Sequence, residues 1–173
     1  MTPNDYAITL LNGGFHLIQL RKFTAGSDAN CKQAAVKNWP NSLLPTEEEV
    51  AGWTDRNYGV LCGKNDVVVI DADSDDSCDW VRENLPPTPM MVKTPRGYHF
   101  YYRCAQKLRD KKSVNELLPM DIKASGYVVG PGCMRVDSIG MPFVGYQLTN
   151  YGHEPTVDDL PYLEDEDILI LGR

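Results

Sequence analysis

An apolar segment near the middle of the chain ends in two acids. Residues 67–70 read Val-Val-Val-Ile, and Asp71 and Asp73 follow with one alanine between them. A short apolar run of this kind is typical of a buried strand. Because side chains alternate along a strand, the two carboxylates should lie on one face. Paired carboxylates repel each other unless a cation lies between them, and oxygen ligands at this spacing suit Mg²⁺ or Mn²⁺.

The same residues allow a second interpretation. Residues 73–77 read Asp-Ser-Asp-Asp-Ser, which is also typical of the N-terminus of a helix. The acids could then belong to a plain strand followed by an acidic turn. Taken alone, the pair leaves metal binding and helix capping both open.

Two later segments carry further candidates for chemistry. His99 lies in Gly-Tyr-His-Phe-Tyr, and Asp121 lies in Met-Asp-Ile-Lys, each in a predicted strand. Three carboxylates from separate strands can hold two divalent ions, as phosphoryl-transfer sites require. A histidine near lysine and arginine, behind a glycine that lets the backbone approach, would suit a triphosphate. The ordinary alternatives are a strand histidine with a routine hydrogen bond and an aspartate in a turn.

The elements that must position these residues follow from the patterns of apolar residues and turn formers. Helices are predicted over 3–12, from the capping residue Thr46 through Trp53, and over 77–84. Strands are predicted over 15–20, 57–61, 67–70, 90–93, 98–103, 121–123, 127–129 and 143–148. Two hairpins are expected, one joining 57–61 to 67–70 and one joining 90–93 to 98–103. Strands outnumber helices, so we expect an α+β fold with mixed or antiparallel sheets and flanking helices.

The composition restricts the class of protein. A chain of 173 residues suits one domain, and 42% apolar with 24% charged residues is typical of soluble globular proteins. No apolar run is long enough to span a bilayer, and no signal peptide is expected. The five cysteines are scattered without a Cys-x-x-Cys pair. We therefore expect neither a disulfide framework nor zinc, and a cytoplasmic location.

The charge is unevenly distributed along the chain. A net charge of −7 argues against a protein that coats nucleic acid by bulk attraction. Basic residues nevertheless dominate between Lys93 and Lys123, whereas every charged residue from Glu154 to Asp167 is acidic. Local fields of this kind can steer an anionic ligand into a cleft. We expect residues 1–153 to form the domain and residues 154–173 to form an acidic segment that begins a linker.

Four motifs in a fixed order resemble a known family. They are Gly59-Val60-x-x-Gly63, Asp71-x-Asp73, Thr94-Pro95-x-Gly97-x-His99, and Asp121-x-Lys123-x-x-Gly126-Tyr127-Val128-Val129-x-Pro131. Together they resemble the primase–polymerase domain of the archaeo-eukaryotic primase superfamily. The closer resemblance is to the bifunctional DNA primase/polymerase N-terminal domain of phage and plasmid replication proteins. The resemblance covers nearly the whole chain, and it implies an RRM-like catalytic core plus an N-terminal αβ module.

The resemblance also implies a role for each motif residue. Asp71 and Asp73 correspond to the first metal motif and Asp121 to the third, so these acids would be the catalytic ligands of two Mg²⁺ or Mn²⁺ ions. The incoming nucleotide would be bound by the residues of the second and third motifs, which are His99, Lys123, Arg96 and Gly97. Arg96 stands where such proteins often have serine, so it either binds phosphate or caps its turn. Only Cys104 lies where family members often carry a zinc-binding insertion, so that module is not expected.

The implied activity is template-dependent nucleotidyl transfer from NTPs or dNTPs onto DNA, with a helicase domain expected downstream and no membrane partner. Two alternatives remain. A haloacid-dehalogenase-like phosphatase also begins with an apolar strand and Asp-x-Asp, with Asp71 as nucleophile and Asp73 as general acid. A non-catalytic module that binds an origin or single-stranded DNA would keep the fold, but it has no use for clustered carboxylates that repel phosphate.

Overall fold

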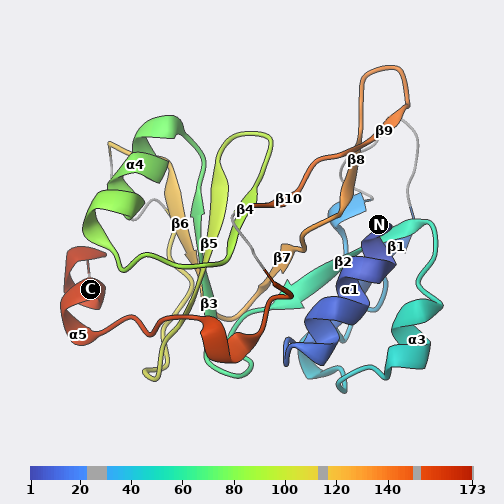
Figure 1. Ribbon diagram of the computed structural model, residues 1–173, viewed down its shortest axis with the longest axis horizontal. Coiled ribbons are helices and arrows are strands. Elements are labelled where there is room, and N and C mark those ends of the chain that lie inside the picture. The colour runs from blue at the N-terminus through green and yellow to red at the C-terminus, as the bar shows by residue number, and fades with distance from the viewer. Residues whose placement is uncertain (23–30, 113–116, 150–152, 173) are drawn as a thin grey trace.

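The computed structural model describes residues 1–22, 31–112, 117–149 and 153–172 (Figure 1). Its α-helices are α1 (Pro3–Asn12), α3 (Glu47–Ala51), α4 (Asp75–Asn84) and α5 (Asp165–Ile170). Its strands are β1 (Leu17–Lys22), β2 (Arg56–Leu61), β3 (Val67–Ala72), β4 (Met91–Lys93), β5 (Tyr98–Arg103), β6 (Met120–Lys123), β7 (Tyr127–Val129), β8 (Met134–Val136), β9 (Pro142–Val144) and β10 (Gln147–Thr149). Two 3-10 helices cover Trp39–Asn41 and Val157–Asp159.

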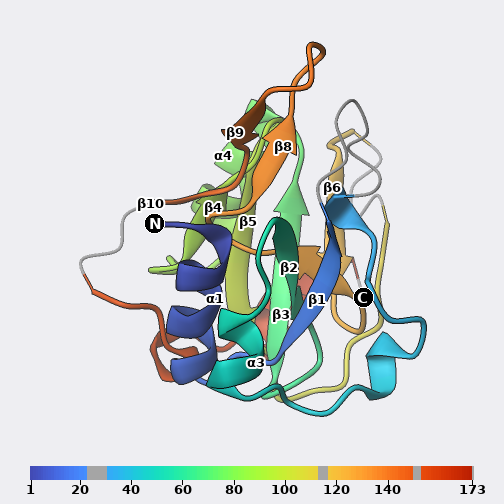
Figure 2. The same cartoon turned by 90° about the vertical axis from the view of Figure 1, so that its right-hand side faces the viewer.

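Two sheets form the body of the molecule. The first has the strand order β1-β2-β7, and the second has the order β10-β4-β5-β3-β6. The hairpin β8–β9 forms a separate two-stranded sheet that projects from the body (Figures 1 and 2). All pairings between the named strands are antiparallel. The predicted α+β class with a single domain is therefore confirmed.

Strand β3 contributes side chains to both hydrophobic cores. Val67 and Val69 lie in the core that joins the two sheets and α1. Val68 and Ile70, on the opposite face, lie in the core beneath α4 and the C-terminal segment. Burial on both faces explains why this strand reads as a continuous apolar run. By the same alternation, Asp71 continues the face of Val67 and Val69, which is the face turned toward the first sheet.

Several local predictions are confirmed. Helix α1 covers residues 3–12, and Thr2 caps it by accepting a hydrogen bond from the Asp5 amide at 3.3 Å. The hairpin of residues 90–93 and 98–103 forms as β4 and β5. Helix α4 begins two residues earlier than predicted, because Ser74 and Ser77 form a capping box at its start. The acidic stretch after Asp73 therefore does cap a helix.

Two strand predictions are wrong. Residues 57–61 and 67–70 form no hairpin, since β2 pairs with β1 and β7, whereas β3 pairs with β5 and β6. The turn between them has positive φ angles at Gly63, Asn65 and Asp66, and it sends the chain from one sheet into the other. The single strand expected over 143–148 is divided into β9 and β10, which belong to different sheets. The predicted irregular segment 24–44 lies partly outside the described residues.

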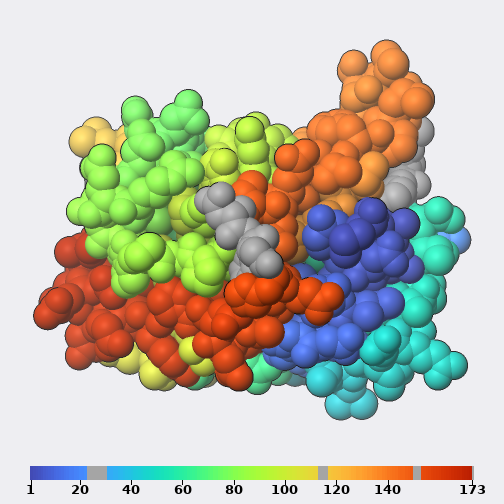
Figure 3. Space-filling view, viewed as in Figure 1, coloured from blue at the N-terminus to red at the C-terminus, as the bar shows by residue number. Residues whose placement is uncertain are grey.

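The C-terminal segment packs on the domain. Val157 and Leu160 belong to the core between the sheets, and Leu163, Ile168 and Leu171 belong to the core beneath α4. The segment lies along one side of the body, in red in Figure 3. The Val157 amide donates to the Gly13 carbonyl at 2.8 Å. A domain boundary at residue 153 and a linker beyond it stay predictions, while residues up to Leu171 are part of the packed structure.

All five cysteines are free and buried. Burial raises the pKa of the Cys133 thiol to about 12, so this thiol is protonated and unreactive at neutral pH. No helix in the described residues is both long and apolar enough to cross a membrane. The cytoplasmic location stays a prediction.

Candidate functional site

The predicted site residues meet at one end of β3. In the register of the second sheet, Asp71 lies opposite His99 of β5 on one side and opposite Asp121 of β6 on the other. Residues directly opposite each other in antiparallel strands point to the same face. Asp73 follows β3, and its amide donates to the Pro119 carbonyl at 2.9 Å. This hydrogen bond continues the pairing of β3 with β6 by one more residue. Three adjacent strands thus bring together residues that are up to 50 positions apart in the sequence.

The turn between β4 and β5 lies directly against the chain that carries the acids. It is closed by hydrogen bonds between Thr94 and Gly97, from the Thr94 amide to the Gly97 carbonyl at 2.8 Å and from the Gly97 amide to Thr94 Oγ1 at 3.1 Å. A Cβ atom on Gly97 would lie 1.8 Å from the Ala72 carbonyl oxygen. Only glycine allows this approach. The approach brings Arg96 to Asp73.

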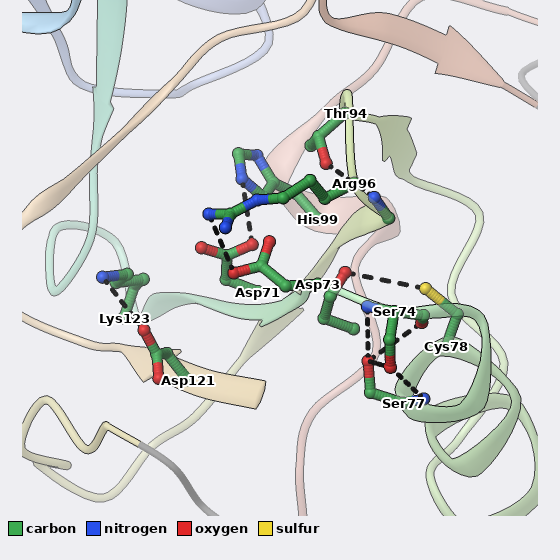
Figure 4. A network of polar contacts seen from close by, with 12 residues as sticks. Asp71, Asp73, Ser74, Ser77, Cys78, Thr94, Arg96, His99, Asp121 and Lys123 are labelled. Atoms are coloured by element: carbon green, nitrogen blue, oxygen red, sulfur yellow. Dashed lines mark hydrogen bonds and ion pairs between the residues drawn. The ribbon is translucent and has the colours of Figure 1, made fainter. Parts of the chain in front are cut away.

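Each predicted acid lies beside a nitrogen group of the same set (Figure 4). The closest pairs are Asp71 Oδ1 with His99 Nε2 at 3.5 Å, Asp73 Oδ2 with the Arg96 guanidinium at 3.5 Å, and Asp121 Oδ2 with Lys123 Nζ at 3.7 Å. Asp71 and Asp73 lie side by side, with Asp121 and Lys123 farther along the sheet. Within the described ranges, no three Asp, Glu, His or Cys side chains already converge as a metal ion requires. The backbone brings the acids together, and their carboxylates are turned toward separate partners.

The negative charges of Asp71, Asp73 and Asp121 repel one another. Burial raises the pKa of Asp71 above its ordinary value, the Lys123 ammonium lowers it, and the Asp121 carboxylate raises it again. Burial also raises the pKa of Asp73, and the neighbouring Asp71 carboxylate adds to that rise. Like charges held on adjacent strands are destabilising without a compensating cation. A cationic ligand would therefore relieve repulsion at this place.

His99 is the most buried polar member of the site. Its exposed fraction is 6%, and burial lowers its pKa to about 4, so the imidazole is neutral at pH 7. Its contact with Asp71 is thus a polar contact and not an ion pair. The Nδ1 atom is buried and finds no hydrogen-bond partner in the part of the chain that the structure describes. A buried nitrogen left in this way is free to bond a ligand.

A cleft of about 290 Å³ opens between the two sheets at this point. It is lined by Lys32, Asp71, His99, Lys123, Tyr127, Val128, Val129 and Tyr146. Of the predicted residues, it contains Asp71, His99 and Lys123, while Asp73, Asp121, Arg96 and Gly97 lie outside its lining. Larger cavities of about 360 and 370 Å³ lie beside Lys64 and beside α4, and neither contains a predicted site residue. Size therefore does not locate the site here, and we assign it by its chemistry.

The sequence prediction missed three polar lining residues, which are Lys32, Tyr127 and Tyr146. Lys32 lies in the segment that was predicted to be irregular, and the Tyr127 hydroxyl donates to its carbonyl at 2.7 Å. The Tyr146 ring lies 6.0 Å from the His99 ring between centroids. Tyr127 could have been found, since it belongs to the Gly-Tyr-Val-Val motif. Lys32 and Tyr146 carry no local signal, because only the packing of the two sheets brings them to the cleft.

A comparison with protein families decides which fold family this is. The family model described as "Bifunctional DNA primase/polymerase, N-terminal" matches residues 7–154. The chain belongs to the bifunctional DNA primase/polymerase N-terminal family. The match contains every predicted site residue, and it confirms the resemblance seen in the motifs. A search of the curated proteins finds no match.

Membership of the primase/polymerase family also weakens the phosphatase alternative. That alternative expects a long α/β fold, whereas the named strands here pair only in antiparallel fashion. Asp71 lies opposite His99 on one side and Asp121 on the other. It is therefore one of several clustered carboxylates and not an isolated nucleophile. The family implies primase or polymerase activity together with binding of DNA and nucleotides.

Proposed function

We propose that this chain is a template-dependent nucleotidyltransferase that makes or extends primers from NTPs or dNTPs. The observation that carries the proposal is the register that sets Asp71 of β3 between His99 of β5 and Asp121 of β6. This arrangement puts acids on one face with His99, whose buried Nδ1 has no hydrogen-bond partner among the described residues, beside a cleft between two sheets. In the reaction, a primer 3′-hydroxyl would attack the α-phosphorus of the nucleotide, lose its proton, and displace pyrophosphate in line.

The donor set suits Mg²⁺ or Mn²⁺. Carboxylate oxygens are the ligands these ions prefer, and Asp71, Asp73 and Asp121 would hold them. Burial and the neighbouring carboxylates raise the pKa of Asp71 and Asp73, and a bound cation would favour their charged forms. When bound, the ions supply activation of the hydroxyl and neutralise charge on the leaving pyrophosphate. The carboxylates would have to rotate away from their present nitrogen partners to share an ion.

The remaining polar residues would bind the nucleotide. Lys123 and His99 both line the cleft, and the neutral His99 ring has a buried Nδ1 without a hydrogen-bond partner in the described residues. Arg96 is exposed at the rim, where its guanidinium would reach the triphosphate once Asp73 turns inward. Gly97 would act by holding its turn against Ala72. That the chain comes from a phage or plasmid replication protein with a helicase domain downstream stays a prediction.

The test of the proposed function is incorporation of a labelled nucleotide. The purified chain is given a primed DNA template and each labelled NTP or dNTP, with Mg²⁺, with Mn²⁺, and with EDTA. We expect extension of the primer that requires one of the two metals. Binding of the template without incorporation under every condition would instead favour the non-catalytic module.

Replacing Lys123 separates nucleotide binding from DNA binding. In Lys123→Met we expect KM for the nucleotide to rise by about tenfold or more, because a charge-assisted contact to the triphosphate is lost. Affinity for primed DNA measured without nucleotide should stay within about twofold of that of the unaltered chain. Lys64→Met is the matched control, since Lys64 is exposed in the turn at the opposite end of β3. Equal KM values for the two variants would remove Lys123 from the nucleotide site.

A further inference from the structure

The β8–β9 hairpin exposes a group of apolar side chains. The exposed fractions are 81% for Ile139, 58% for Met141, 44% for Phe143 and 43% for Val144. The hairpin stands clear of the body in both ribbon views and forms the highest point of the space-filling view (Figures 1, 2 and 3). Apolar side chains gathered on one exposed element mark an interaction surface.

The base of the hairpin is firmly attached to the first sheet. Asn57 of β2, which is 1% exposed, donates through Nδ2 to the Met134 carbonyl at 2.8 Å and accepts from the Met134 amide at 2.8 Å. The Gly145 amide donates to the Cys133 carbonyl at 3.0 Å. An isolated two-stranded hairpin is marginally stable in water. These buried contacts hold the hairpin at a defined position on the domain.

That position continues the wall of the catalytic cleft. Val128 and Val129 line the cleft shortly before the chain enters β8, and Tyr146 lines it just after β9. The Gly132 amide joins the two segments by donating to the Tyr146 carbonyl at 2.7 Å. The turn that carries Arg96 and the hairpin point to the same end of the molecule in Figures 1 and 2. A DNA strand that leaves the cleft toward this end of the molecule would run along the hairpin.

The hairpin carries one basic and one acidic side chain, Arg135 and Asp137, so its formal charges cancel. Arg135 lies directly opposite Phe143 in the register, so a cation and an aromatic ring share one face. The Asp137 carboxylate accepts from the amides of Ile139 at 3.0 Å and Met141 at 2.8 Å, so it is held against the backbone of the tip. A chain with a net charge of −7 gains little from bulk attraction to phosphate. Apolar packing on bases is then the available source of affinity.

We propose that the β8–β9 hairpin binds primed DNA beside the cleft, with Ile139, Met141 and Phe143 packing on bases and sugars. The proposal rests on the proposed function in taking primed DNA as the ligand. It adds the surface that holds the primer–template, which the site residues alone do not provide.

The test is binding of a fluorescein-labelled primed template, measured by anisotropy in EDTA without nucleotide. The variant combines Ile139→Ser, Met141→Ser and Phe143→Ser, and the control combines Leu169→Ser and Ile170→Ser on α5, which are also exposed. We expect Kd to rise by about tenfold or more for the hairpin variant and to stay within about twofold for the control. The slope of log Kd against log salt should be unchanged in both, because no phosphate contact is removed.

A photocrosslinker provides a direct measurement. With p-benzoylphenylalanine at position 143, we expect a crosslink to the labelled DNA, and none with the same group at position 169. Unchanged Kd in the hairpin variant, no binding of primed DNA by the unaltered chain, or a monomer–dimer equilibrium that depends on these three side chains would each overturn the proposal. DNA binding that depends on the hairpin without any incorporation by the unaltered chain would overturn the proposed function and leave the hairpin assignment standing.

Discussion

Replacing Asp71 by asparagine should lower nucleotide incorporation by at least about a hundredfold, because the variant loses a charged ligand at the centre of the three-strand site. Asparagine keeps the shape of the side chain, so the fold should remain. Burial raises the pKa of Asp71 above 3.8, so the charged form is disfavoured in the folded state. The favourable contribution of this group is present below its ordinary pKa and is lost as the pH rises through the folded value. At pH 7 in EDTA, Asp71→Asn should therefore unfold at the same temperature as the unaltered chain or higher.

The measurement pairs single-nucleotide extension rates with thermal unfolding in EDTA. Asp76→Asn is the matched control, since Asp76 is an exposed acid in the first turn of α4, close in sequence and outside the site. Its extension rate should stay within about twofold of that of the unaltered chain. Normal extension by Asp71→Asn would exclude Asp71 as a catalytic ligand. Lower stability with lost extension would point to a structural role instead.

Replacing Gly97 by alanine should reduce both stability and activity. The added Cβ would lie 1.8 Å from the Ala72 carbonyl oxygen and 3.2 Å from the Asp73 Cα atom, so the turn or the strand end must move. Overpacking of this kind costs about 1–3 kcal/mol in the free energy of unfolding. The displaced turn carries Arg96, and the acid pair lies under it, so extension should fall by about tenfold or more. Denaturant unfolding and extension assays measure the two effects.

Gly126→Ala is the control for this prediction. A Cβ on Gly126 would meet only Asp110 Oδ2 at 3.5 Å, an ordinary contact. The free energy of unfolding should change by less than about 1 kcal/mol in either direction, because alanine also restricts the unfolded chain. If the Gly97 and Gly126 variants behave alike, the contact between the 94–97 turn and Ala72 does not position the site.

The features found from sequence depend on short-range rules. The apolar run 67–70 and its two acids define a buried strand with a charged end. Ser74 caps α4, because its hydroxyl accepts a hydrogen bond from the Ser77 amide three residues later. The turn of residues 94–97 closes through hydrogen bonds between its first and last members. In each case, the interacting groups are neighbours in the chain, so residue types and spacing suffice.

The errors concern partners that are distant in sequence. Both β2 and β3 were recognised as strands, but the three positive φ angles between them lead the chain to a different sheet, which no periodicity encodes. The linker expected to begin at residue 154 stays a prediction, but the packing of this segment also depends on distant partners. Its apolar residues, including Val157 and Leu163, are buried against segments about 60 to 140 positions away.

The sequence by itself determined the family, the fold class and the identity of the residues that could do chemistry. The order of the motifs and the alternation of apolar residues can both be read from the sequence alone. Only the tertiary structure decided how those residues meet. The register of β3 sets Asp71 between His99 and Asp121, the packing of two sheets brings Lys32 and Tyr146 to the cleft, and side-chain rotation leaves each carboxylate beside its own nitrogen partner. These are long-range contacts, and their free energy depends on the whole fold.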